Sequence, residues 1–343
     1  GLIINLVDYK KKKEKLFMHA QRGENNLSLL LIIFNKRDYK MKYLLSSILL
    51  LALSNVSFAQ GEERLLRING TEINIRTFGN GSPILVVHGG PGLNHSYFLP
   101  QFETLASNHR LIFIDQRACG KSAGSLDSTQ MSLDWFVKDM EAVRKELKLG
   151  KVSVLAHSWG GLLGMLYASR YPESIRTLII SNSVSPKAGE YDKQTNEIIS
   201  SRYTKEDSTL SAQTLKSNAF KEGDLEAYKV LFKVSFKQSF YNRSYIDSLN
   251  LTLPSDFVQK RNILFLMAKE LSDYNFYPDL KKIKCETLII HGDYDAIPIE
   301  LAQNINKSIH TSKLAVIKDA GHFPFIEQKA AFFNVVEDFL AKK

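Results

Sequence analysis

The stretch SVLAHSWGGLLGML (residues 153–166) decides how this chain folds, because it joins two apolar runs at a serine flanked by small residues. The first run predicts a buried strand and the second a buried helix. The join nearly matches the pattern G-x-S-x-G, in which a serine occupies a sharp strand-to-helix turn, although Ala156 replaces the first glycine. One added methyl group relaxes this pattern without forbidding the turn. Ser158 is therefore a candidate nucleophile, with a purely structural serine as the alternative.

Strands and helices alternate on both sides of this stretch. Residues 132–150 have helical apolar spacing, begin with the predicted capping residue Ser132 and end at Gly150. The continuous apolar runs around this helix are typical of strands covered on both faces, and such alternation favours a parallel sheet flanked by helices. Further strands are predicted at 83–90, 110–117 and 175–183, and an antiparallel hairpin is predicted at 63–79 around Asn69-Gly70.

A helical insertion interrupts this pattern. Residues 185–280 are rich in Lys, Tyr, Phe and Ser and contain no convincing buried strand, whereas 286–295 and 312–321 again predict strands and a last helix follows. We therefore expect an α/β core formed by 60–184 and 281–343, with 185–280 as a helical cap over the carboxyl edge of the sheet. Clefts for small molecules form at that edge.

The first 59 residues have the features of a leader. Met41-Lys42 precedes an apolar stretch of about fourteen residues and the small-x-small ending at 57–59, which together predict a signal peptide at 41–59. We expect translation to start at Met41, residues 1–40 to be upstream readthrough, and the mature protein to be secreted or periplasmic. The apolar stretch is shorter than the roughly 20 residues of a membrane-spanning helix. No stable membrane insertion of the mature chain is expected, and a membrane-anchored tail is the alternative.

Charge and cysteine content exclude several classes of function. The net charge is +9, but residues 1–59 contribute +6 of it, so the remainder is nearly balanced and no nucleic-acid partner is expected. Cys119 and Cys285 are too few for a disulfide framework, and we expect two free, buried thiols. No cluster of His, Cys and Asp has metal-ligand spacing. The sequence predicts no metal and no cofactor, and it does not address the oligomeric state.

Residues late in the chain occupy the positions that a serine nucleophile requires. A serine hydroxyl attacks a substrate only when an imidazole accepts its proton and a carboxylate orients that imidazole. In the chain order Ser, Asp, His, the acid follows a late strand and the histidine follows the next one. Asp293 and Asp295 follow the run TLII, and His322 follows the run LAVIKDAG. Each could be a turn or capping residue by itself, but together with Ser158 they predict a Ser-His-Asp triad.

The segment HGGPG (88–92) comes directly after the run PILVV. Consecutive glycines allow backbone N–H groups to point into a cavity without hindrance from a Cβ atom. Such groups stabilise the oxyanion of an acyl-transfer intermediate, and we expect the second donor to be the N–H of Trp159, the residue after the serine. A simple Gly-Pro turn explains the glycines but not their position at the end of a strand.

These motifs together resemble those of one protein family. HGGPG, DQRACGKS (115–122), AHSWGG, HGDYD and AGH are similar to the motifs of the α/β-hydrolase superfamily and, within it, of the proline-iminopeptidase-like branch. The similarity spans nearly the whole mature chain, and HGGPG followed by DQR is the part most specific to that branch. The resemblance implies an α/β-hydrolase fold with an inserted helical cap.

The resemblance also assigns a role to each candidate residue. It implies that Ser158 is the nucleophile, Asp295 the acid and His322 the base, and that Gly90 and Trp159 form the oxyanion hole. The second aspartate of HGDYD is preferred as the acid because the family pattern is His-Gly-x-x-Asp.

The chain departs from the family pattern at points that bear on its substrate. Ala156 and Ala118 stand where the family usually has glycine. Proline iminopeptidases hold the free N-terminal amine of their substrate with cap carboxylates, and here Glu270 in LMAKELSD and Glu226 at the start of a cap helix are the candidates. A solvated helix face is the alternative for each glutamate. These departures affect the predicted aminopeptidase specificity more than the hydrolase chemistry.

The resemblance implies a serine hydrolase that works through an acyl-enzyme and releases the N-terminal residue, proline above all, from short peptides. A carboxylesterase that acts on small acyl esters is the alternative on the same scaffold. A hydrolase-like binding protein without catalysis is the alternative from another class, although such proteins normally lose a triad member and all three are present here. The expected partner is a small peptide or ester.

Overall fold

The computed structural model describes residues 61–125 and 127–342. The predicted signal peptide at 41–59 and the upstream residues 1–40 lie outside these ranges, so both assignments stay predictions. None of the helices in the described ranges is long and apolar enough to span a membrane.

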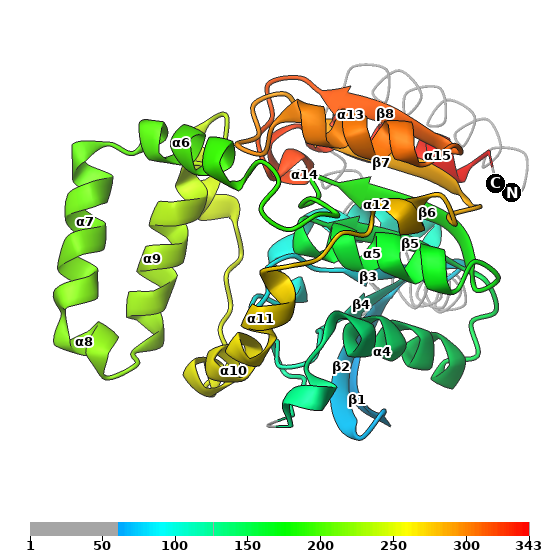
Figure 1. The fold of residues 1–343 in the computed structure, drawn as a ribbon, viewed down its shortest axis with the longest axis horizontal. Coiled ribbons are helices and arrows are strands. Elements are labelled where there is room, and N and C mark those ends of the chain that lie inside the picture. The colour runs from blue at the N-terminus through cyan, green and yellow to red at the C-terminus, as the bar shows by residue number, and fades with distance from the viewer. Residues whose placement is uncertain (1–60, 126, 343) are drawn as a thin grey trace, which may run out of the picture. The chain divides into compact units, whose positions relative to one another are not determined.

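Eight strands form one sheet in the order β1-β2-β4-β3-β5-β6-β7-β8. The predicted hairpin around Asn69-Gly70 joins β1 to β2, and β2 also pairs antiparallel with β4, whereas the other pairs are parallel. Figure 1 shows helices flanking this sheet, which confirms the predicted fold class. The strands are β1 (Glu62–Ile68), β2 (Thr71–Phe78), β3 (Ser82–Val87), β4 (His109–Ile114), β5 (Val152–His157), β6 (Ile175–Ser181), β7 (Glu286–Gly292) and β8 (Ser312–Ile317).

Helices cover both faces because the central strands alternate between two hydrophobic cores. Along β3, Leu85 and Val87 belong to one core, whereas Ile84 and Val86 belong to the other. The first core is completed by α4 (Leu133–Glu146), α5 (Trp159–Arg170), α12 (Tyr277–Leu280) and α13 (Ile299–Ser308), and the second by η2 (Gln101–Ser107), α14 (Pro324–Glu327) and α15 (Lys329–Leu340).

The start of α4 differs from the expectation. Ser132 is its N-cap residue, but the Ser132 side chain makes no capping hydrogen bond. Instead, Oε2 of Glu270, from the helical insertion, accepts the N–H of Leu133 at 2.9 Å. The exposed N–H groups at a helix start need such partners. Here the partner comes from a segment distant in sequence, which a local pattern does not reveal.

The insertion between β6 and β7 is helical. Thr204 and Asp207 form a capping box at the start of α7, and Asp224 accepts two N–H groups at the start of α9. Figure 1 shows α7 and α9 side by side and set away from the sheet, with α10 and α11 nearer the core. The helices of four or more residues are α6 (Asp192–Arg202), α7 (Lys205–Lys216), α8 (Asn218–Lys221), α9 (Leu225–Lys237), α10 (Phe257–Leu264), α11 (Ala268–Leu271) and α12 (Tyr277–Leu280), together with the 3-10 helix η4 (Arg243–Ser248).

The carboxyl ends of five parallel strands carry the residues that matter for the site. HGGPG follows β3, Ser158 follows β5, Asn182 follows β6, Asp295 follows β7 and His322 follows β8. Because these strands are parallel and adjacent in the sheet, their following loops meet at one edge.

Candidate active site

Ser158 occupies a strained turn between β5 and α5. Its backbone has φ 55° and ψ −123°, a conformation that non-glycine residues seldom adopt. The Ser158 N–H donates to the Ser181 carbonyl at 2.9 Å, and the Ser158 carbonyl accepts from the Gly161 N–H at 2.8 Å. Strain of this kind costs about 1–3 kcal/mol and persists only where neighbouring structure holds it. The turn leaves Ser158 at the wall of a cavity.

Close packing around this turn explains its small residues. A Cβ atom at Gly160 would lie 2.5 Å from the Val87 carbonyl oxygen, so glycine is required there. Ala156 is fully buried, and its methyl group fits because Gly164 lies opposite it on α5. A Cβ atom at Gly164 would lie 3.0 Å from the Ala156 Cβ. The glycine missing from the motif is thus balanced by one later in the helix.

The structure brings Ser158, His322 and Asp295 together from three separate loops. His322 Nε2 lies 2.9 Å from Ser158 Oγ, and His322 Nδ1 lies 2.9 Å from Asp295 Oδ2. An ionised carboxylate only accepts hydrogen bonds, so Nδ1 carries the ring proton and Nε2 of the neutral ring is free to accept the serine proton. This arrangement is the one that activates a hydroxyl for nucleophilic attack.

Asp295 is buried, and Asn182 helps to hold its charge. Asn182 Nδ2 donates to Oδ2 of Asp295 at 2.7 Å, and the Ile297 N–H donates to Oδ1 at 3.2 Å. Burial raises the pKa of Asp295, but the electrostatic interaction and hydrogen bond with His322 and the hydrogen bond from Asn182 lower it by more, so the net pKa is well below its usual value. Asp293 is exposed by comparison. Sequence reasoning missed Asn182, whose only signal is its position at the end of β6.

The predicted oxyanion donors lie beside Ser158. Gly90 has φ 120°, a conformation that favours glycine, and it lines the same cavity as Ser158. Gly89 packs so tightly that a Cβ atom there would lie 2.9 Å from the Ser158 Cβ. Within residues 61–125 and 127–342, the N–H groups of Gly90 and Trp159 have no backbone acceptor. Both donors are therefore available to a bound oxygen atom.

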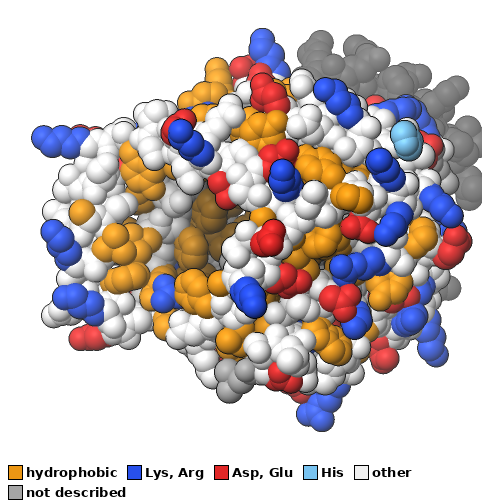
Figure 2. All heavy atoms as spheres, in the orientation of Figure 1, with side chains coloured by type: hydrophobic (Ala, Val, Ile, Leu, Met, Phe, Trp, Pro, Cys, Tyr) orange, Lys and Arg blue, Asp and Glu red, His pale blue; other side chains and the backbone are white. Residues whose placement is uncertain are grey.

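The cavity at Ser158 is small and largely aromatic. Its volume is about 280 Å³. On one side its walls are Gly89, Gly90, Pro91, Leu93, Tyr97, His157, Ser158, His322 and Phe323 of the core, and on the other side they are Phe232, Ser235 and Phe236 of α9. None of the described residues that line it is Asp or Glu. Figure 2 shows a hollow between α9 and the core in which hydrophobic side chains gather.

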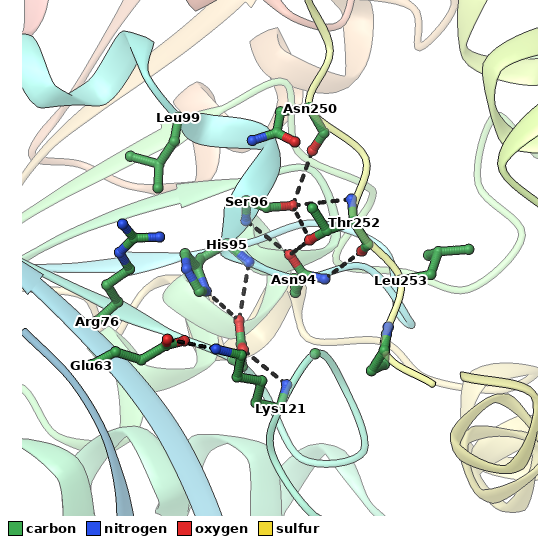
Figure 3. Close-up of a pocket in the computed structure, with 13 residues that line it drawn as sticks. Glu63, Arg76, Asn94, His95, Ser96, Leu99, Lys121, Asn250, Thr252 and Leu253 are labelled. Carbon is green, nitrogen blue, oxygen red and sulfur yellow. Dashed lines mark hydrogen bonds and ion pairs between the residues drawn. The ribbon is translucent and has the colours of Figure 1, made fainter. Parts of the chain in front are cut away.

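A second cavity of about 310 Å³ is lined by the next part of the same loop (Figure 3). Asn94 Nδ2 donates to the Thr252 carbonyl at 2.7 Å, and Ser96 Oγ donates to the Asn250 carbonyl at 3.0 Å. These polar groups are thus paired with one another. They tie the helical insertion to the loop that leads from HGGPG to Tyr97.

Neither of the two glutamates predicted to bind a substrate amine is among the described residues that line the cavity at Ser158. Glu226 is 76% exposed and forms an ion pair with Lys229 at 2.7 Å. It lines a different cavity, together with Lys229, Val230 and Lys233 of the same helix. Glu270 instead caps α4, as described above. The sequence placed both residues in the cap but could not show which way they face.

Nothing in the described ranges is arranged as a metal centre. No group of three or more His, Cys, Asp or Glu side chains there could hold a metal ion. Cys119 is buried and Cys285 is half-buried, and both are free thiols. Burial raises the pKa of the Cys119 thiol to about 12, so this thiol is a poor nucleophile.

The family assignment follows from comparison with known proteins. The family model described as the alpha/beta hydrolase fold matches residues 82–329. The chain therefore belongs to the α/β-hydrolase fold family, and its motifs resemble those of the proline-iminopeptidase-like branch.

Individual relatives agree with this class. A proline iminopeptidase of Saccharolobus solfataricus is 26% identical over 301 residues, which cover 83% of this chain and 93% of the relative. An α/β fold family hydrolase from Bacillus anthracis aligns with a TM-score of 0.64 and 21% identity over 81% of this chain and 99% of its own. An esterase from Exiguobacterium antarcticum aligns with a TM-score of 0.62 and 22% identity over 82% of this chain and all of its own. These two structural likenesses bear on the fold alone.

Proposed function

We propose that this protein is a serine hydrolase that works through an acyl-enzyme. One observation carries the proposal: the two ring nitrogens of His322 each lie 2.9 Å from a partner, Ser158 Oγ on one side and Asp295 Oδ2 on the other. Ser158 attacks the acyl carbon while His322 accepts its proton. His322 then donates that proton to the leaving group.

Electrostatics support this cycle. The imidazolium that forms on His322 is stabilised by Asp295, which stays ionised because its pKa is lowered. The negative charge on the tetrahedral oxygen is stabilised by the N–H groups of Gly90 and Trp159, and removing one such donor typically costs about 10²–10³ in kcat. A water molecule, activated in turn by His322, releases the acyl group and regenerates the serine.

Labelling with a fluorophosphonate tests this mechanism. We expect covalent modification of Ser158, located by mass spectrometry, and its loss in Ser158→Ala. Ser235→Ala is the matched control, because Ser235 lines the same cavity and is not proposed to be activated. A folded wild-type protein that the reagent does not modify would favour a binding protein without catalysis instead.

For the substrate, we propose the N-terminal residue, with proline first, of short peptides. The similarity to an enzyme named proline iminopeptidase supports this substrate class. The cavity of about 280 Å³ suits one small residue with an apolar ring, which would contact Phe232 and Phe236.

The carboxylesterase alternative rests on a specific observation. A protonated amine needs a carboxylate partner in a site of low polarity, and no Asp or Glu is among the described residues that line this cavity. A neutral acyl ester needs no such partner. Turnover of a prolyl arylamide against that of acyl nitrophenyl esters of similar size separates the two substrate classes. Faster ester turnover with no preference for a free amine would reject the peptidase.

We also propose that the enzyme works outside the cytoplasm, on the basis of the signal-peptide pattern at 41–59. N-terminal sequencing of protein recovered from the producing cell tests this, with Gln60 expected as the first residue. An uncleaved leader would contradict it.

A further inference from the structure

A buried chain of hydrogen bonds joins the segments that carry the proposed chemistry. The N–H of Gly89 donates to Tyr97 Oη at 2.5 Å, Tyr97 Oη lies 2.9 Å from His157 Nδ1, and His157 Nε2 lies 2.8 Å from the carbonyl oxygen of His322. Gly89 precedes the proposed oxyanion donor Gly90, and His157 precedes the proposed nucleophile. The chain therefore connects the oxyanion loop, the serine turn and the loop of the base without using a triad side chain.

Every proton in this chain has a defined direction. The carbonyl of His322 can only accept, so His157 Nε2 carries the ring proton. Nδ1 of the neutral ring then accepts from the Tyr97 hydroxyl, and the Tyr97 oxygen is left to accept from the Gly89 N–H. In this series of hydrogen bonds each donor has one acceptor, and none of the polar groups that form it lacks a partner.

Burial keeps this direction constant. Tyr97 and His157 are each 1% exposed. Burial lowers the pKa of His157 to about 3, so the ring stays neutral near neutral pH, and burial raises the pKa of Tyr97. Protonation of His157 would make both ring nitrogens donors and would break the chain at Tyr97.

We infer that Tyr97 and His157 are positioning residues that hold the Gly90 N–H and the His322 ring at a fixed spacing around Ser158. The inference rests on the proposed function, because it concerns the geometry of that reaction. Neither residue is one of the proposed reacting groups. Their effect acts through Gly89 and the backbone of His322.

A packing role alone makes a different prediction. The Tyr97 ring contacts the rings of Phe98, Phe323 and Phe325, and phenylalanine at position 97 keeps these contacts. Tyr97→Phe removes only the hydroxyl, and it leaves the Gly89 N–H and His157 Nδ1 without partners. If Tyr97 only fills space, this variant should turn over like the wild type.

We expect Tyr97→Phe to lower kcat about tenfold and to leave KM within about twofold, because small misplacements of reacting groups slow the chemical step more than they weaken binding. Tyr167→Phe is the matched control. The Tyr167 hydroxyl is also buried and donates to Glu141 Oε2 at 2.9 Å, but Tyr167 does not line the cavity. That variant should keep its wild-type kcat.

Position 157 provides a rescue test. A glutamine side chain offers an acceptor and a donor at nearly the spacing of the two ring nitrogens, whereas leucine offers neither. We expect His157→Gln to keep kcat within about threefold and His157→Leu to lose at least as much as Tyr97→Phe. Nitrogen-15 NMR of histidine-labelled protein should show His157 protonated at Nε2 and bare at Nδ1 at neutral pH.

The outcomes separate the two proposals. A wild-type protein that is not labelled at Ser158 rejects the proposed function. A labelled wild type with unchanged kcat in Tyr97→Phe, or equal losses in Tyr97→Phe and Tyr167→Phe, rejects the positioning role alone. A His157 ring protonated at Nδ1 at neutral pH also rejects it, whatever the kinetics.

Discussion

Asn182 Nδ2 and His322 Nδ1 donate to the same oxygen of Asp295, Oδ2, at 2.7 and 2.9 Å. Because the Asn182 amide and the His322 imidazole share this acceptor, the amide helps to fix the position of the oxygen to which the imidazole donates. The backbone of Asn182 has φ 48° at the end of β6, and its N–H donates to the Ile290 carbonyl at 2.9 Å. Asp295, the proposed acid, is therefore held by a residue that follows the neighbouring strand.

Removal of this amide should slow catalysis. Asn182→Gly deletes the side chain and tolerates the positive φ, and we expect about tenfold lower kcat, since a hydrogen bond to a charged group contributes about 1.5–3 kcal/mol. Asn69→Gly is the control. Asn69, in the turn between β1 and β2, also has positive φ, and its side chain donates to the carboxylate of Asp139 at 2.9 Å. Equal kcat in the two variants would show that Asn182 is not needed to orient the acid.

The packing of Ala156 against Gly164 can be measured as a coupling free energy. Gly164→Ala adds a methyl group 3.0 Å from the Ala156 Cβ and 3.3 Å from Leu178 Cδ1, and we expect it to lower the free energy of unfolding by about 1 kcal/mol. In an Ala156→Gly background the same change should stabilise, since alanine is favoured over glycine in helices by about 1 kcal/mol. Chemical denaturation of the four proteins gives the coupling, and additive effects would contradict the close contact.

Two buried histidines should make stability fall in mild acid. Burial lowers the pKa of His88 to about 4 and that of His157 to about 3, whereas both protonate near 6.5 in the unfolded chain. The unfolded state therefore binds more protons below pH 6.5. Stability from these residues is fully present above pH 6.5 and is lost as the pH falls towards 4, by about 1.4 kcal/mol per pH unit for each histidine.

Urea denaturation at pH 7, 6 and 5 measures that slope. His157→Gln should reduce it by one histidine, and replacement of the exposed His310 with glutamine should leave it unchanged. An unchanged slope in His157→Gln would mean that His157 is not held neutral in the folded protein.

Glu270 should matter for stability and not for catalysis. Glu270→Ala removes the acceptor of the Leu133 N–H at the start of α4, and we expect a loss of about 1 kcal/mol in the free energy of unfolding, as for other helix caps. Glu226→Gln, at an exposed ion pair, should change stability by less. Both variants should keep the wild-type kcat/KM for prolyl arylamides. A large rise in KM for free-amine substrates alone would restore either glutamate as an amine-binding residue.

The sequence was most informative about candidate site residues that directly follow predicted parallel strands. Ser158, Asp295 and His322 could be placed at one edge because each follows a predicted parallel strand. Glu226 and Glu270 could not be oriented, because the rotation of a cap helix depends on tertiary packing that leaves no short-range pattern.

Partners from distant segments were missed for a related reason. Asn182 and Tyr97 form hydrogen bonds with residues 113 and 60 positions away in the sequence. Gly164 looked like an ordinary helix residue until its distance from Ala156 was known. The predicted capping role of Ser132 failed in the same way, since the acceptor came from another part of the chain.

The position of the helical insertion between β6 and β7 has a consequence for how proteins of this fold family diversify. Ser158, the proposed nucleophile, is encoded before this insertion, and Asp295 and His322, the proposed acid and base, are encoded after it. Exchange of the helical insertion between relatives would therefore change which molecules enter the cavity at Ser158, while these three residues would stay on the α/β core. Conversely, cleavage of one peptide bond in the helical insertion would divide the chain into two fragments, neither of which contains all three residues.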